Sequence, residues 1–298
     1  MIISSILKDI TVILPLYKTP CEKISLLKNY KFINTIVLDQ CGDIYSKKKI
    51  KNQFNQKLQY FNTSHNLGFS KACNILLSKV KTKFCLLTQA DILISINTIL
   101  KLKKIFYKEK KCIVAAPKII YSSKNFLKNN FFKDDYYIKV KNIIGACFLF
   151  DVKKMKKIGF FDEDFFLYWE DVHLCHKIHK SNYKIFELKN YSALHYSAQS
   201  SMNNLKVTFL RNLNYVFGEY LFFFKIKKLR SIKILRQLIQ RLFYFFYNFS
   251  IMNFKKSFIE FCKFLGILKF ITFIIKRYFC NFNKIIFENK KKERWPSG

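Results

Sequence analysis

Two aspartates each follow a short apolar run and could take part in binding a nucleotide or a cation. Residues 36–38 lead into Asp39, and the segment 84–90 leads into Asp91. A carboxylate at the carboxyl end of a strand can accept hydrogen bonds from a nucleobase N–H or a ribose hydroxyl. It can also help to hold a Mg²⁺ ion that bridges a diphosphate. The alternatives are that Asp39 is a turn residue and that Asp91 caps a helix.

The segment 158–175 sets five carboxylates among aromatic residues. Burying Asp or Glu beside Phe and Trp is unfavourable without a partner, and an apolar pocket is one way in which a general base is tuned. Glu170 and Asp171 stand together in this segment, and His195 follows 24 residues after Asp171. The pattern predicts an acid–base centre, with His195 as a further contact for a metal or a phosphate.

A loop at residues 65–74 contains Gly68 and leads into a predicted helix. Backbone N–H groups at a helix N-terminus can bind an anion, and Lys71 adds a positive charge. The alternative is an ordinary connection between a strand and a helix, and the loop alone does not decide between the two.

Short β-branched runs alternate with helical patterns through the first 200 residues or so, which is typical of βαβ units around a mainly parallel sheet. The predicted strands are 10–17, 35–39, 59–62, 84–88, 113–117 and 143–150, and the predicted helices are 21–30, 71–80 and 98–108. Ligands of such sheets bind at the carboxyl ends of the strands. We therefore expect the site at that edge, beside Asp39, Asp43 and Asp91.

In the order of its motifs, the chain resembles glycosyltransferase family 2, in particular the rhamnosyltransferase-like branch that builds cell-surface polysaccharide. The resemblance covers roughly residues 10–200 and lies in the motifs ILPLYK, VLDQCGD, NLGFSKACN, LLTQAD, GACFLF, IGFFDEDFFLYWEDVHLC and LHYSAQSS. It implies a GT-A nucleotide-diphospho-sugar transferase fold, an inverting mechanism and a divalent cation, Mg²⁺ or Mn²⁺. It also implies a nucleoside-diphosphate sugar, with rhamnose as the candidate sugar, and a polysaccharide or lipid-linked glycan as the acceptor.

The resemblance assigns roles to individual residues. Asp171 corresponds to the general base, with Glu170 beside it, and Asp91 and His195 correspond to metal ligands near the diphosphate. The positions expected to bind the nucleotide sugar are Pro15, Tyr17, Asp39, Asn66, Gly68, Lys71, Asn74, Gln89, Asp91, Gly145 and Asp162.

Several positions depart from the usual family pattern. Lys18 stands where Asn is common, Cys41 and Gly42 replace an Asn-x-Ser run, His173 replaces an Asp, and Lys177 stands near a usual Arg. These departures leave the recognition of the nucleobase open, while the proposed base and metal ligands are retained.

The composition changes after residue 204, so we expect a GT-A catalytic domain at 1–204 and a basic, aromatic-rich helical module at 205–298. No stretch of this module reaches the roughly 18 uncharged apolar residues that a spanning helix needs. One helical stripe consists of Phe258, Phe261, Leu265, Leu268 and Ile275. An apolar stripe beside lysines favours attachment to a membrane surface, and packing against the catalytic domain is the alternative.

The chain contains 54 Lys and Arg against 19 Asp and Glu, a net charge of +35. Such a field can hold anionic lipid, nucleic acid or phosphorylated substrates, so a non-enzymatic protein that binds membrane or nucleic acid is the second hypothesis. The sequence contains no recognised nucleic-acid-binding motif, and the acidic segment 162–171 would repel phosphate without a metal. We therefore expect an enzyme without a nucleic-acid partner.

The nine cysteines are scattered and form no CxxC pair, which favours a reduced, cytosolic setting. Together with the basic tail, this predicts a cytoplasmic protein that is peripheral at the inner face of the cell membrane. A zinc site at His173, Cys175, His176 and His179 is disfavoured, because a structural zinc site usually needs four well-spaced ligands.

Overall fold

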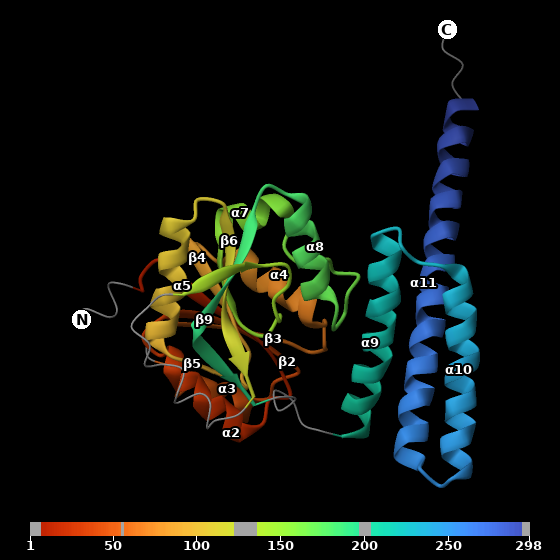
Figure 1. Ribbon diagram of the computed structural model, residues 1–298, viewed down its shortest axis with the longest axis horizontal. Coiled ribbons are helices and arrows are strands. Elements are labelled where there is room, and N and C mark those ends of the chain that lie inside the picture. The colour runs from red at the N-terminus through yellow and green to blue at the C-terminus, as the bar shows by residue number, and fades with distance from the viewer. Residues whose placement is uncertain (1–6, 55–56, 122–135, 197–203, 294–298) are drawn as a thin grey trace. The chain divides into compact units, whose positions relative to one another are not determined.

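The computed structural model describes residues 7–54, 57–121, 136–196 and 204–293 (Figure 1). The chain divides into two compact units, Met1–Val207 and Thr208–Gly298.

Nine strands of the described residues form one sheet in the first unit. They are β1 (Ile10–Tyr17), β2 (Asn34–Gln40), β3 (Leu58–Thr63), β4 (Phe84–Leu87), β5 (Ile92–Ile94), β6 (Cys112–Ile120), β7 (Tyr137–Val140), β8 (Phe148–Asp151) and β9 (Lys184–His195). Their order is β3-β2-β1-β4-β8-β6-β9-β5, with β7 also paired to β9. The run β3-β2-β1-β4 and the pair β6–β9 are parallel. Strand β8 is antiparallel to β4 and β6, and both β5 and β7 are antiparallel to β9.

Helices cover both faces of this sheet (Figure 1). They are α2 (Cys21–Ile24), the 3₁₀ helix η1 (Ser25–Tyr30), α3 (Ile44–Lys51), α4 (Phe69–Lys79), α5 (Ile96–Lys108), α7 (Val152–Ile158) and α8 (Glu170–Lys180). On β1, Val12 and Leu14 pack into one core with α2, α3 and α5. Ile13 packs into the other core with α4, α7 and α8. Successive side chains of a strand point to opposite faces, so one apolar run supplies both cores. The α/β fold predicted from the sequence is confirmed.

The prediction was wrong for the strand at 143–150, which begins only at Phe148. Ile143, Ala146 and Cys147 are buried in the turn before β8, and a short apolar run does not by itself distinguish a strand from another buried segment. The sequence reasoning also missed α3, β5, β7, α7 and β9.

Three helices make up most of the second unit: α9 (Leu205–Lys225), which begins just before the division, α10 (Ser231–Ser250) and α11 (Phe254–Glu293). Arg241 of α10 donates to Glu260 of α11 at 2.8 Å. Lys269 of α11 donates to Asn214 of α9, also at 2.8 Å. Helix α11 therefore packs against both other helices. Among the described helices, none combines the length and the apolar composition that crossing a membrane requires.

Gly266 allows α9 and α11 to pack closely, and we expect Gly266→Val to destabilise the second unit. A Cβ atom at this position would lie 2.5 Å from the backbone oxygen of Leu213. A backbone oxygen cannot swing aside as a side-chain tip can, so the two helices would have to separate. Overpacking of this kind typically lowers the free energy of unfolding by about 1–3 kcal/mol, which urea unfolding would measure. Thr272→Val, at an exposed position of the same helix, is the control, and an equal loss in both variants would contradict this account.

Candidate active site

The topology brings four of the predicted site segments to one edge of the sheet. Strands β1, β2 and β4 run parallel as neighbours, so Tyr17, Asp39 and Asp91 lie at or beyond their carboxyl ends. Strand β8 runs antiparallel to β4, and Leu87 pairs with Phe148. The turn before β8, which contains Gly145, therefore lies at the same edge. This is the edge at which open α/β sheets bind their ligands.

Asp39 is buried near the end of β2, and its carboxylate is held by a neighbouring strand. The Tyr60 hydroxyl on β3 donates to Asp39 Oδ2 at 2.9 Å. Burial raises the pKa of Asp39, and the Tyr60 hydrogen bond opposes that rise. A Cβ atom on Gly42 would lie 2.0 Å from the same oxygen, so glycine leaves room for the carboxylate. Sequence reasoning missed both Tyr60 and this reason for Gly42.

Asp91 and His195 lie together although they are far apart in the sequence. Strand β5 begins directly after Asp91 and pairs antiparallel with β9, placing Ile92 opposite His195. His195 Nε2 lies 3.4 Å from Asp91 Oδ2, and the Asp91 side chain is fully buried. Asp91 does not cap α5, because the Ser95 side chain accepts from the first turn of that helix. His195 Nδ1 is buried and has no hydrogen-bond partner among the described residues.

Asp171 lies in the first turn of α8 and is held by the turn before β8. The Gly145 N–H donates to Asp171 Oδ2 at 2.9 Å. A Cβ atom on Gly145 would lie 2.8 Å from Asp171 Cβ. Sequence reasoning expected Gly145 to contact the sugar nucleotide, whereas the structure places it directly against the predicted base.

Glu170 and Asp171 differ in their tendency to hold a proton. Burial, and then the charge of Asp171, raise the pKa of Glu170 to about 8. Burial also raises the pKa of Asp171, but hydrogen bonds from the backbone of Gly145 and Val172 oppose that rise. Burial thus favours the protonated form of Glu170, whereas the hydrogen bonds from Gly145 and Val172 favour the charged form of Asp171.

The backbone just before this pair adopts an unfavourable conformation. Tyr168 and Trp169 both have φ of 69°, in the left-handed region. This region costs L-residues roughly 1–2 kcal/mol each, and such conformations persist where the surrounding structure enforces them. The two residues set the direction in which Glu170 enters α8.

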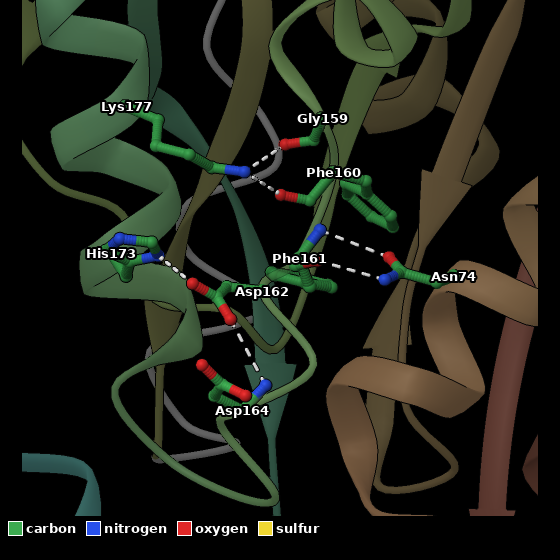
Figure 2. Close-up of polar contacts among 8 residues, drawn as sticks. All are labelled: Asn74, Gly159, Phe160, Phe161, Asp162, Asp164, His173 and Lys177. Carbon is green, nitrogen blue, oxygen red and sulfur yellow. Dashed lines mark hydrogen bonds and ion pairs between the residues drawn. The ribbon is translucent and has the colours of Figure 1, made fainter. Parts of the chain in front are cut away.

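A loop at residues 159–164 is held between α4 and α8 (Figure 2). Lys177 donates to the carbonyl oxygens of Gly159 and Phe160. Asn74 accepts from the Phe161 N–H at 3.1 Å and donates to the Phe161 carbonyl at 2.9 Å. The resemblance assigns Asn74 to binding of the sugar nucleotide, but its side-chain amide is engaged by this loop, which favours a role in holding the loop.

Asp162 and His173 add a further contact between this loop and α8. His173 Nδ1 lies 3.7 Å from Asp162 Oδ2, and Asp162 Oδ1 accepts from the Asp164 N–H at 3.1 Å (Figure 2). The His173 ring also packs against Phe165, with ring centroids 5.1 Å apart. His173, which replaces an Asp of the usual family pattern, thus has Asp162 as a local partner.

The glycine loop before α4 uses its amides within the protein. The N–H groups of residues 67–69 donate, in order, to the side chains of Gln40 and Asn66 and to the Phe166 carbonyl, at 2.7, 2.9 and 2.7 Å. These hydrogen bonds favour the alternative in which the loop is an ordinary connection between a strand and a helix. Lys71 is exposed on the first turn of α4 and is the part of this loop that retains the predicted attraction for an anion.

The other predicted contacts for the sugar nucleotide lie at the same edge. Pro15 and Tyr17 on β1 are half-buried, as is Gln89 after β4. Their side chains are partly accessible at the carboxyl ends of the strands. The end of the last motif, residues 197–201, lies outside the described residues.

The zinc alternative gains no support from the part of the chain that the structure describes. No group of three or more His, Cys, Asp or Glu side chains there is arranged to hold a metal ion by protein ligands alone. His179 Nε2 lies 2.5 Å from the Lys141 carbonyl, and Cys175 is buried with a free thiol. The side chains of His179 and Cys175 therefore lie in different surroundings.

Comparison with known families agrees with this architecture. The model of glycosyl transferase family 2 matches residues 23–176, and the chain belongs to this family. No curated protein sequence gives a significant match.

Two solved structures share the fold. A mannosyltransferase, PcManGT from Pyrobaculum calidifontis, solved with GDP-Man and Mn²⁺, is 16% identical with a TM-score of 0.53, over 72% of this chain and 64% of that chain. GalNAc-T7, solved with UDP, GalNAc and Mn²⁺, is 13% identical with a TM-score of 0.50, over 71% of this chain and 47% of that chain. The matches thus span less than two thirds of either relative. At these identities, the likeness supports the GT-A fold alone.

The buried Glu170 carboxyl should make the stability of the protein depend on pH. Its pKa is raised on folding from 4.5 to about 8, so its contribution is fully present below about pH 4.5 and is lost as the pH rises towards 8. The maximum slope for one such group is about 1.4 kcal/mol per pH unit. We expect Glu170→Gln to make this decline shallower, as measured by urea unfolding at several pH values between 5 and 8. Glu163→Gln, at an exposed position, is the control, and a decline in Glu170→Gln as steep as that of the unaltered protein would refute the assignment.

Proposed function

We propose that this glycosyltransferase moves a sugar from a nucleoside diphosphate to a polysaccharide or lipid-linked glycan, with inversion at the anomeric carbon. The observation that carries the proposal is the contact between Gly145 and Asp171 at the sheet edge that also bears Asp39 and Asp91. The resemblance to the rhamnosyltransferase-like branch makes rhamnose the candidate sugar. Asp39 is proposed to bind the nucleoside.

Asp171 is proposed as the general base. As the acceptor hydroxyl attacks the anomeric carbon from the face opposite the diphosphate, its proton passes to the Asp171 carboxylate. A bond forms from the acceptor oxygen to the anomeric carbon, and the bond from that carbon to the diphosphate oxygen breaks. The Gly145 N–H orients the carboxylate, and the raised pKa of Glu170 favours its protonated form beside the Asp171 carboxylate. Attack from the opposite face inverts the anomeric centre.

Asp91 and His195 are proposed to hold a divalent cation, Mg²⁺ or Mn²⁺. Asp91 Oδ2 and His195 Nε2 lie 3.4 Å apart, and both atoms are of types that bind divalent cations. Mg²⁺ commonly takes one or two protein carboxylates and completes its shell with phosphate oxygens and water, so two protein groups fit such a site. When bound, the cation would neutralise the charge that develops on the leaving diphosphate. Both solved relatives described above contain Mn²⁺.

We also propose that the protein works in the cytoplasm as a peripheral protein at the inner face of the cell membrane. The Thr208–Gly298 unit contains 19 Lys and Arg against four Glu and no Asp. Such an excess attracts anionic lipid surfaces. A lipid-linked acceptor would be presented at the same surface.

Asp171→Asn should abolish transfer while leaving the binding of the sugar nucleotide nearly intact. Asn retains the shape of the side chain but cannot accept a proton at neutral pH, and loss of a general base typically lowers the rate by about 10²–10⁴-fold. The loss should appear in kcat rather than in the affinity for the sugar nucleotide. Hydrolysis of a nucleotide sugar, together with equilibrium binding of the nucleoside diphosphate, would measure both.

Glu170→Gln and Asp162→Asn are the matched comparisons, because both residues belong to the same acidic segment. If Asp171→Asn turned over normally while one of these variants was inactive, the base would be misassigned. Activity in all three variants would make the whole segment structural.

Asp91→Ala should weaken the metal-dependent binding of nucleoside diphosphates. A panel of nucleoside diphosphates with Mg²⁺ or Mn²⁺, tested by thermal shift, would show which base the site accepts, because stabilisation grows with the ratio of ligand concentration to Kd. In Asp91→Ala the additional shift on adding metal should disappear. Asp9→Ala is the control, because Asp9 precedes β1 at the other edge and pairs with Lys103. Binding that stayed equally metal-dependent in Asp91→Ala would show that Asp91 is not a ligand.

A further inference from the structure

Helix α10 carries an exposed apolar stripe along its whole length. The stripe, called the α10 stripe below, consists of Ile232, Leu235, Ile239, Leu242, Phe246 and Phe249. These residues follow one another at spacings of three and four, so they share one face of the helix. Their exposed fractions range from 37% to 76%. The sequence analysis had identified a stripe on α11 but not this one.

A different face of α10 is already occupied by α11. Arg241 pairs with Glu260 at 2.8 Å, and the rings of Phe245 and Phe261 lie 5.5 Å apart. These contacts fix which face of α10 points away from α11. A surface helix normally presents polar residues on its outer face, whereas α10 presents aliphatic and aromatic ones.

The apolar surface continues around the tip of the α10–α11 hairpin. Phe249 and Phe254 are both exposed, and their ring centroids lie 5.5 Å apart. Ile251 and Met252 between the helices are exposed as well. A contiguous apolar surface of this kind marks a site of interaction with a protein or a membrane.

The charges around this surface distinguish between these partners. Basic residues flank it at the start of α10 and at the start of α11, namely Lys227, Lys228, Arg230, Lys255 and Lys256. Glu219 and Glu260, the acidic side chains described in this unit, already pair with Lys233 and with Arg241 and Lys263. A second copy would bring like charges together, whereas an anionic lipid surface would complement them.

We infer that the α10 stripe and the hairpin tip form the membrane-docking surface, with α10 lying in the plane of an anionic bilayer interface. Helices of this kind bury their apolar face at the boundary of headgroups and acyl chains, and basic residues strengthen binding to anionic lipids. The inference deepens the proposed function and rests on it for its purpose, which is to bring the catalytic unit to a lipid-linked acceptor.

The test uses the full chain and vesicles of phosphatidylcholine, with or without phosphatidylglycerol, in a flotation assay without nucleotide sugar. We expect the protein to bind the vesicles that contain phosphatidylglycerol and Ile239→Ser/Phe246→Ser to bind them at least about tenfold more weakly. Burying a side chain of this size is worth roughly 1.5–3 kcal/mol, and about 1.4 kcal/mol corresponds to tenfold. The control is Phe32→Ser/Ile44→Ser, which removes an exposed Phe and an exposed Ile from the first unit and should bind like the unaltered protein.

Three results would overturn the inference. Failure of the unaltered protein to bind anionic vesicles is the first, and undiminished binding of the stripe variant is the second. The third concerns the stripe variant without vesicles. If it lost self-association in sedimentation, the stripe would be covered by another copy, and if it lost more thermal stability than the control, the stripe would be covered by this chain. Ile239→Ser alone replaces the double variant should that variant not fold. Hydrolysis of a nucleotide sugar without vesicles tests the proposed reaction independently.

Discussion

The burial of the Glu170 carboxyl beside Asp171 is the constraint on which the proposed chemistry depends. Glu170 is buried, and its burial and the charge of Asp171 both raise its pKa. Backbone N–H groups of Gly145 and Val172 donate to the Asp171 carboxylate and oppose the rise in its pKa that burial causes. A second charge in this space would be strongly unfavourable. The proposed division of roles between the two carboxylates rests on the hydrogen bonds that Asp171 receives from Gly145 and Val172.

Much of the surrounding structure serves to hold this pair in position. The turn before β8 must bring Gly145 within reach of α8, and the pairing of β8 with β4 places that turn at the edge where Asp91 emerges. Lys177 and Asn74 hold the loop that leads towards α8 (Figure 2). The left-handed conformations of Tyr168 and Trp169 complete the path into the helix. A catalytic group is effective only when its supporting contacts fix its geometry.

The second unit differs from the first in where its apolar side chains lie. The first unit buries its apolar side chains in two cores on either face of a sheet, whereas α10 leaves a row of them exposed. Exposed apolar surface of this extent is unfavourable in water. The unit also carries a large excess of positive charge. Contact with an anionic bilayer surface would account for both the exposed apolar side chains and the positive charge. The transfer reaction explains neither of them.

The sequence by itself determined the fold class, the family and the segment that contains Glu170 and Asp171, because these depend on local patterns of apolar, acidic and aromatic residues. It also identified Asp91 and His195 as candidate partners, and the structure places them together. It could not show that Asn74 and the amides before α4 are engaged within the protein, that Tyr60 holds Asp39, or that Gly145 holds Asp171. Each of these facts depends on contacts between segments distant in the chain. Only the tertiary structure decided them, because the register of paired strands and the packing of helices determine which distant groups meet, and spacing along the chain does not.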